Sequence, residues 1–159
     1  MVRPFVKLSL LLLIALQLIA LQTATAQAKS PPESMTAAAN AFLAALTAEQ
    51  QTEAALPFET PLRRDWHNIP KEDRKGVEFG ELNAEQQQLA LALLRSALSD
   101  VGYEKATRIM SLENNLREGE KNVAGAPFRD PERYFITIFG EPADKGTWGW
   151  SFEGHHFSQ

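Results

Sequence analysis

Hydrophobic side chains recur every three or four residues through the middle of the chain, as they do on one face of a helix. Leu91, Leu94 and Leu98 fall on one line of the segment Ala84–Leu98. A second apolar stripe runs from about Tyr103 to Arg117. The short connection between these two segments predicts an antiparallel pair of helices.

Two helix starts carry the same capping signal. Residues 35–46 are rich in alanine, which favours a helix by intrinsic propensity. The sequence Leu-Thr-Ala-Glu-Gln-Gln at 46–51 is then followed by Leu-Asn-Ala-Glu-Gln-Gln at 82–87. In each copy a Thr or Asn precedes a Gln by three residues, which is a capping box. Each copy therefore predicts the first turn of a helix, and we expect the glutamines 86–88 to stay outside the apolar arc.

The last third of the chain has a strand pattern instead. Residues 133–139 are aromatic and β-branched, and residues 147–157 alternate, with Trp148, Trp150 and Phe152 on one face. These segments predict an antiparallel hairpin. The whole chain is therefore predicted to be α+β, with amino-terminal helices packed on this carboxy-terminal hairpin.

The predicted hairpin would be incomplete by itself. Its second strand runs to Gln159 with no turn signal, and a two-stranded hairpin is marginally stable in water. Both of its edges would also be open. We therefore expect the hairpin to belong to a larger sheet, with the domain truncated at its carboxy-terminal end. Self-association through the hairpin is the alternative.

Residues 1–26 match an export signal. Arg3 and Lys7 precede the apolar run Leu8–Leu21, and Ala24-Thr25-Ala26 is a small-x-small cleavage pattern. The run is shorter than the roughly 20 residues that a spanning helix needs. An uncleaved membrane anchor is the alternative. We expect a secreted or periplasmic protein with these parts: signal peptide 1–26, flexible leader 27–34 and a single α+β domain 35–159.

Composition excludes several kinds of chemistry. The chain has 159 residues, a net charge of −4 and no cysteine. Disulfides, thiolate metal sites and cysteine nucleophiles are therefore absent. A net acidic chain lacks the basic surface that binds nucleic acid. No second apolar run follows the signal, so we expect no membrane partner once the signal is removed.

Residues 57–81 form an irregular, proline-punctuated segment, and long irregular segments within domains are often functional. They contain the first of several motifs that occur in one order along the chain: Trp66-His67-Asn68-Ile69-Pro70, Arg74 with Gly76-Val77, Leu94 with Asp100 and Gly102-Tyr103, Ile109-Met110 with Leu112-Glu113, Tyr134 with Phe139-Gly140 and Pro142, and Trp148-Gly149-Trp150 with Phe152-Glu153-Gly154-His155-His156. This set resembles the bacterial family labelled domain of unknown function 3500, which is recognised by a Gly-His-His motif. The resemblance implies an exported protein whose relatives continue well past that motif. It implies no activity.

All three histidines, His67, His155 and His156, lie within these motifs. Three imidazoles could hold a catalytic divalent transition metal such as zinc or copper. On a regular strand, adjacent residues point to opposite faces, so His155 and His156 could share one ion only through a bulge, for example at Gly154. Without a bulge, Glu153 and His155 share a face, and His67 would join them from the irregular segment. The alternative is that these histidines are ordinary core and surface residues.

Glu113 is a candidate general base. It falls on the apolar line of its predicted helix, where partial burial would raise the pKa of its carboxyl group. The alternative is a surface Glu that pairs with Arg117 four residues later. Trp66, Trp148 and Trp150 could likewise line a cleft for a sugar or aromatic ligand, or pack in the core.

Two classes of function fit these patterns. The first is an exported metal-dependent enzyme, or the amino-terminal part of one, using the histidines and Glu113. The second is a non-catalytic exported binding or scaffold module in which the His and Trp residues are structural.

Overall fold

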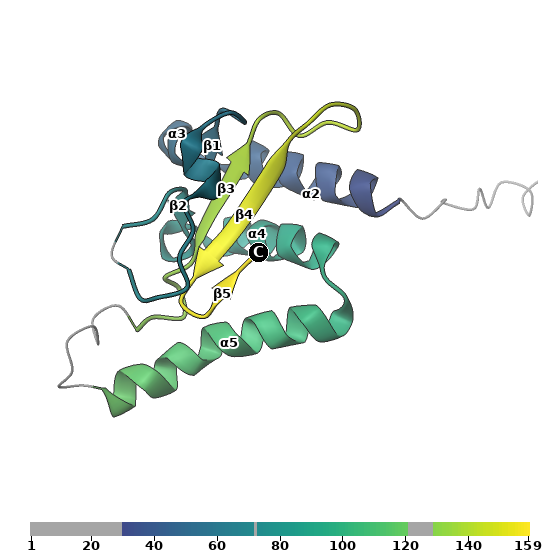
Figure 1. Cartoon of the computed structure of the whole chain (residues 1–159). Helices are drawn as coiled ribbons and strands as arrows, with labels where there is room; N and C mark the ends of the chain where they lie inside the picture. Colours follow the sequence, from purple (N-terminus) through teal and green to yellow (C-terminus); the bar gives the residue numbers. More distant parts are fainter. Residues whose placement is uncertain (1–29, 72, 121–128) are drawn as a thin grey trace, which may run out of the picture.

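A computed structural model describes residues 30–71, 73–120 and 129–159. It is an α+β fold in which helices pack on a mixed five-stranded sheet (Figure 1). The elements are α2 (Pro31–Ala45), α3 (Ala48–Ala54), β1 (Ala55–Leu56), η1 (Pro61–Arg64), β2 (Val77–Glu78), η2 (Phe79–Glu81), α4 (Ala84–Ala97), α5 (Asp100–Gly119), β3 (Phe135–Phe139), β4 (Gly149–Gly154) and β5 (Phe157–Ser158). The predicted fold class is confirmed.

The repeated capping signals are both confirmed, and the two copies bind each other. Thr47 with Gln50 caps α3, and Asn83 with Gln86 caps α4. The side-chain amide of Gln86 donates to the Gln50 Oε1 at 2.8 Å and to the Ala45 carbonyl at 2.8 Å. The expectation that Gln86 stays outside the apolar arc was wrong, because these bonds let the side chain be buried at 3% exposure.

The first helix begins earlier than the pattern predicts. α2 starts at Pro31, inside the segment expected to be a flexible leader. Proline suits the first helical position because its missing N–H would have no partner there. Ser30 and Glu33 add a capping box. Residues 27–29, like the expected signal peptide, lie outside the described residues.

The helix α4 packs chiefly along α2, while α5 turns back below it in Figure 1. Ser99 caps the start of α5, where its hydroxyl oxygen accepts a hydrogen bond from the Gly102 N–H at 3.1 Å. Sequence periodicity predicted the pair of helices but not that α2 would be the main neighbour of α4. Packing partners depend on long-range contacts that periodicity alone does not encode.

The predicted hairpin is present as β3 and β4, with Ile136 opposite Phe152. Two short strands from the middle of the chain pair with the other edge of β3. β1 lies parallel to it, with Ala55 opposite Ile138, and β2 lies antiparallel, with Val77 opposite Ile136. The hairpin therefore belongs to a larger sheet within the described chain itself.

The second strand ends earlier than its alternation predicts. β4 stops at Gly154, His155 and His156 form a turn, and β5 returns antiparallel with Phe157 opposite Gly154. The prediction of a strand that reaches the carboxy-terminal end without a turn was wrong. His156 adopts a positive φ of 60°. That conformation favours Gly or Asn, so the sequence carried no strong turn signal there.

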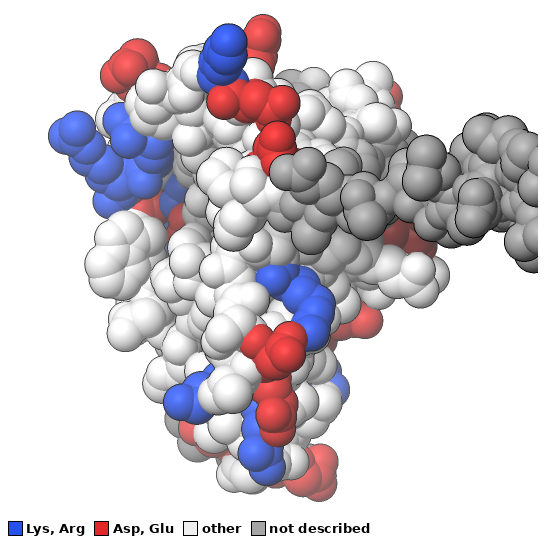
Figure 2. Space-filling model, turned by 90° about the vertical axis from the view of Figure 1, so that its right-hand side faces the viewer, with Lys and Arg blue, Asp and Glu red and all other residues white. Residues whose placement is uncertain are grey.

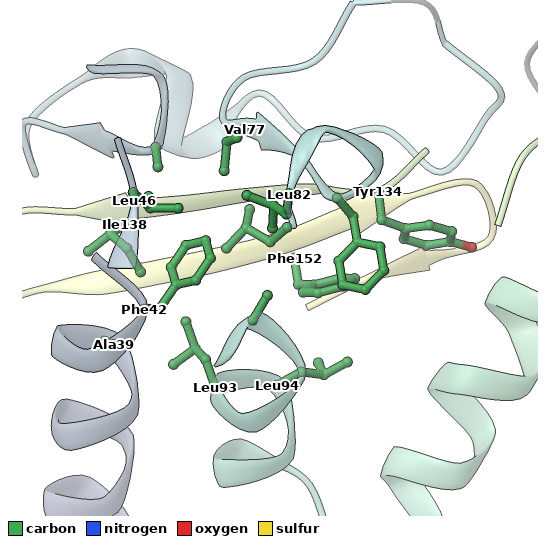
Figure 3. Packing of buried hydrophobic residues seen from close by; sticks show 14 of the residues in the cluster. Ala39, Phe42, Leu46, Val77, Leu82, Leu93, Leu94, Tyr134, Ile138 and Phe152 are labelled. Atoms are coloured by element: carbon green, nitrogen blue, oxygen red, sulfur yellow. The ribbon is translucent and has the colours of Figure 1, made fainter. Parts of the chain in front are cut away.

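Both faces of the sheet are covered. On one face, α2 and α4 bury a hydrophobic cluster that includes Phe42, Leu93, Leu94 and Phe152 (Figure 3). On the other face, Phe135, Thr137, Phe139, Ser151 and Glu153 are also buried. The irregular segment before β2 lies there, since Lys75 bonds with Glu153. The prediction of a domain continuing past Gln159 is not tested by these residues.

No helix in the described part of the chain is long and apolar enough to cross a membrane.

Candidate functional site

The site is centred on a carboxylate and an imidazole that lie 42 residues apart in the chain. Glu113 lies on the buried line of α5 with Ala106 and Met110, at helical spacing. Its exposed fraction is 1%. Its Oε1 is hydrogen-bonded to the Nδ1 of His155, which is itself 7% exposed. The alternative in which Glu113 pairs with Arg117 on the surface was wrong, because Arg117 binds Asp130 and Asn114.

The turn that carries His155 is fixed from three sides. The Tyr134 hydroxyl donates to the His155 carbonyl at 2.7 Å. The N–H of His156 donates to the Asn68 carbonyl at 2.9 Å, which brings the irregular segment to the turn. Gly154 lies against the Tyr134 ring, where a Cβ would come within 2.3 Å of Cδ1. The backbone of His155 is therefore held in place by the Tyr134 side chain, by the irregular segment at Asn68 and by the end of β4.

Hydrogen bonding assigns the protons of His155. Nη1 of Arg129 lies 2.8 Å from Nδ1 and 2.9 Å from Nε2, so the contact with Glu113 decides the assignment: an ionised carboxylate only accepts, and Nδ1 therefore donates to it. In a neutral imidazole whose proton is on Nδ1, Nε2 is the lone-pair nitrogen. Burial lowers the pKa of His155, with His156 and Arg129 acting in the same direction and Glu113 opposing them. The imidazole is therefore neutral at neutral pH.

The remaining groups of the site hold or surround this pair. Nε of Arg129 binds Glu120 at 2.9 Å, so the guanidinium bridges the imidazole and a second carboxylate. The exposed ring of His156 stacks on His155 with centroids 3.7 Å apart. Burial raises the pKa of Tyr134, which keeps its hydroxyl protonated as a donor.

One atom of the pair has no hydrogen-bond partner among the described residues. Oε2 of Glu113 is buried and makes no hydrogen bond within the described chain. A buried carboxylate oxygen without a partner is costly, and such groups occur at sites that bind a ligand or take part in proton transfer. The arrangement can hold an imidazole in one tautomer and stabilise its protonated form.

Glu153 belongs to a different cluster. It is 3% exposed and binds Lys75, with Arg74 at 3.9 Å. The side chains of Arg74 and Lys75 are only 3% and 4% exposed. Both cations also donate to carbonyls of the irregular segment, at Asp65, His67 and Ile69. With two cations at its oxygens, Glu153 supports this segment.

The predicted metal ligands are therefore only partly brought together. Of these four residues only His155 and His156 lie together, while Glu153 binds Lys75 and the exposed His67 binds Asp65 at 3.0 Å. Among residues 30–71, 73–120 and 129–159, no three His, Asp or Glu side chains are grouped to hold a metal ion. Arg129 and Tyr134 were missed. Tyr134 was part of the family motif that it forms with Phe139-Gly140 and Pro142, whereas Arg129 lies in no motif and in no helix or strand pattern.

The tryptophans are divided between surface and core. Trp66 is 60% exposed, while Trp148 and Trp150 pack partly against the hydrophobic cluster. All three line a hollow of about 480 Å³, and Arg63 and Ser151 are also in its wall. The expectation of a tryptophan-lined cleft and the expectation of core packing each describe part of the arrangement.

Fold and site together define an α+β protein with a buried carboxylate–imidazole pair beneath a two-histidine turn. The chain belongs to the family described as "Protein of unknown function (DUF3500)", whose pattern matches residues 28–159. No curated protein and no solved structure matches the chain significantly. The resemblance found in the sequence motifs is confirmed at the level of the family.

Proposed function

We propose that this protein is an exported enzyme in which His155 transfers a proton at Nε2 and Glu113 is its orienting carboxylate. The buried hydrogen bond between Glu113 and His155 carries the proposal. Glu113 holds the proton on Nδ1 and leaves the lone pair of Nε2 available. When Nε2 takes a proton from a substrate, the adjacent carboxylate stabilises the imidazolium.

Energetic cost supports a functional role for the pair. Removing a carboxylate from water costs several kcal/mol, and its attraction to a partner often fails to recover that cost. An apolar pair of similar volume would fill the same space without this desolvation cost. Among the described residues Oε2 of Glu113 also has no hydrogen-bond partner, which a purely structural role would not require.

Arg129 occupies the position that a substrate must reach. Its Nη1 lies 2.9 Å from Nε2 and 2.8 Å from Nδ1 in this structure, and Glu120 binds its Nε. A substrate group that approaches the imidazole therefore replaces the guanidinium at Nε2 or lies between the two. A neighbouring cation would favour a substrate that develops negative charge during the reaction.

Metal-dependent chemistry is the second candidate, and one observation favours it. Proteins commonly orient a metal-binding imidazole by a carboxylate at its other nitrogen, as Glu113 does for His155. The stacked ring of His156 offers a second nitrogen beside it. Zinc or copper is the metal expected for imidazole ligands. The further ligands would come from outside the groups described above.

The test separates the two candidates from a structural module. Full-length mature protein is assayed on chromogenic esters, phosphates and glycosides, with and without chelator. His155→Gln and Glu113→Gln should each lower any turnover by about 10²-fold or more. The exposed His67→Gln is the matched control and should keep full activity.

Each outcome is informative. Loss of turnover in both site variants but not on chelation supports proton transfer by His155. Loss on chelation, restored by Zn²⁺ or Cu²⁺, supports the metal site. The binding or scaffold module would be favoured if no assay shows activity, the thermal unfolding midpoint falls in the His155 variant, and added metal does not change this midpoint. Export would be established if the protein is secreted and its intact mass is that of a chain cleaved after Ala26.

A further inference from the structure

The two carboxylates beside the proposed base already have partners. Glu113 binds Nδ1 of His155, and Glu120 binds Nε of Arg129 at 2.9 Å. Glu113 is also only 1% exposed, so it does not reach a bound substrate. Glycoside hydrolysis needs two carboxyl groups that flank the bond that breaks. Among the described residues the site therefore lacks the arrangement of a glycosidase.

The described site also has no nucleophile beside the imidazole. Covalent catalysis by a hydroxyl needs a Ser, Thr or Tyr within hydrogen-bond reach of the base. Among residues 30–71, 73–120 and 129–159, the side chains bonded to the His155 ring are those of Glu113 and Arg129. The hydroxyl of Tyr134 donates instead to the His155 carbonyl at 2.7 Å. The proton that Nε2 accepts therefore comes from the substrate or from water.

Water has little access to this pair. His155 is 7% exposed, and the side chain of Arg129 beside it is 14% exposed. Exclusion of water strengthens the attraction between a fixed cation and negative charge that develops next to it. Hydrolysis needs an ordered water at Nε2, whereas removal of a proton from the substrate itself needs none. Burial therefore favours a proton that is taken directly from the substrate.

The charges around the imidazole favour a neutral substrate. Two carboxylates, Glu113 and Glu120, lie beside one guanidinium, that of Arg129. A substrate that arrives as an anion would therefore meet an excess of negative charge. In the lower part of Figure 2, where α5 lies, acidic and basic side chains are intermingled and form no basic field that would gather anions. Negative charge that develops only during the reaction would still be stabilised by the adjacent guanidinium.

We propose that the substrate of this site is an uncharged carbonyl compound and that His155 removes a proton from the carbon next to the carbonyl group. The proposal rests on the proton transfer at Nε2 proposed above. The C–H bond breaks and its proton moves to Nε2, while its electron pair forms the C=C bond of an enolate and the carbonyl π pair moves to oxygen. Nη1 of Arg129, 2.9 Å from Nε2, donates to that oxygen. The imidazolium then returns a proton to the enolate, so no co-reactant is consumed.

Hydrogen exchange at carbon tests the proposal while the natural substrate is unidentified. Full-length mature protein is incubated in heavy water and chelator with hydroxyacetone, an uncharged ketone, or with pyruvate, its anionic counterpart. Deuterium that enters the carbons next to each carbonyl is followed by NMR. Exchange of hydroxyacetone should be about 10²-fold faster with the native protein than with His155→Gln. Exchange of pyruvate should be slower than that of hydroxyacetone. Ester, phosphate and glycoside assays do not report this reaction.

The role of Arg129 is tested by two substitutions of different charge. Arg129→Gln removes the cation and should slow exchange of hydroxyacetone by about 10²-fold. Arg129→Lys keeps a positive charge and should recover part of the rate. Arg108→Gln removes an arginine whose side chain is 80% exposed, so it is the matched control and should leave the rate unchanged. A thermal unfolding midpoint for each variant separates loss of the fold from loss of exchange.

The outcomes distinguish this proposal from the one on which it rests. Turnover of an ester or phosphate that depends on His155, without exchange at carbon, would overturn the carbonyl substrate and keep the proton transfer. Exchange that depends on His155 but is unchanged in Arg129→Gln, or that is faster for pyruvate, would overturn the uncharged substrate and the role of Arg129. Neither exchange nor turnover in the folded protein would overturn both proposals.

Discussion

The Tyr134 hydroxyl donates to the carbonyl of His155, 21 residues away, at 2.7 Å and in a buried position. This bond links the residue before β3 to the turn between β4 and β5. It fixes the backbone of the residue whose side chain binds Glu113. The ring of Tyr134 packs in the hydrophobic cluster, so this one side chain connects the core to the candidate site.

Tyr134→Phe should therefore loosen the turn without disturbing the core. The phenylalanine ring fills the same space, but the buried His155 carbonyl loses its donor, which costs about 1–3 kcal/mol of unfolding free energy. Urea denaturation measures the loss. If His155 transfers a proton as proposed, the variant should also lower turnover. An unchanged unfolding free energy would show that the carbonyl finds another partner.

Gly154→Ala should be severely destabilising. An alanine Cβ there would lie 2.3 and 2.4 Å from Cδ1 and Cε1 of the Tyr134 ring, which is fully buried and cannot move away freely. We expect a loss of about 2–4 kcal/mol in unfolding free energy. Gly149→Ala in the same strand is the matched control, because no heavy atom of the described residues, its chain neighbours aside, lies within 4 Å of its Cβ position. A similar loss in both variants would refute the steric explanation.

Local signals predicted the fold wherever the chain's near neighbours decide its structure. The capping residues Asn83 and Gln86 act within four residues of each other, so sequence alone located the start of α4. The alternation of Trp150 and Phe152 located β4 in the same way. The two-residue strands β1 and β2 were not predicted, because strands this short have no detectable period and exist only through pairing with β3.

The candidate site was predicted in its residue types but not in its pairing. Glu113 and His155 were each singled out, one as a base and the other as a ligand. Their hydrogen bond depends on how α5 lies against the turn, and no pattern within either segment encodes that placement. Glu153 was placed beside His155 because a regular strand was assumed. The strand ends at Gly154, so His155 lies in the following turn, and Glu153 binds the cations Arg74 and Lys75 instead.

The burial of His155 predicts acid sensitivity. Its pKa is lowered from 6.5 in the folded state, so at intermediate pH the unfolded chain binds a proton that the folded chain does not. Stability due to this residue is therefore present above about pH 7 and is lost as the pH falls through 6.5 toward the lowered pKa. Each unit of lowering corresponds to about 1.4 kcal/mol.

Unfolding free energies from pH 8 to pH 5 measure this effect. The difference between the native chain and His155→Gln should shrink as the pH falls, because the variant has no imidazole to protonate at that position. His67→Gln removes an exposed histidine and is the control for losing an imidazole from the surface. A profile that is the same for native and His155→Gln protein would exclude His155 as its origin. The charges that face this imidazole are Glu113, His156 and Arg129.

Glu153→Gln should destabilise the irregular segment. It leaves the buried cations Arg74 and Lys75 without their carboxylate, and breaking one partner of a buried ion pair costs about 3–5 kcal/mol. Glu104→Gln is the control, since the Glu104 side chain is 73% exposed and its ion pair with Arg108 is worth little. Thermal unfolding and protease sensitivity near Trp66 measure the effect. If Glu153→Gln behaves like Glu104→Gln, the cations do not depend on Glu153.

Replacing both members of the Glu113–His155 pair tests whether the pair exists for stability or for function. Glu113→Leu alone leaves the buried Nδ1 donor of His155 unpaired and should cost about 1–3 kcal/mol. Combining it with His155→Leu removes both polar groups from the buried position. Apolar replacement of a buried charged pair is often neutral or stabilising, by up to about 4 kcal/mol. We therefore expect the double variant to be at least as stable as Glu113→Leu and to have no turnover, as shown by urea denaturation and the substrate assays. A double variant less stable than either single variant would show that the pair supports the fold, and the proposed proton transfer would then lose its energetic argument.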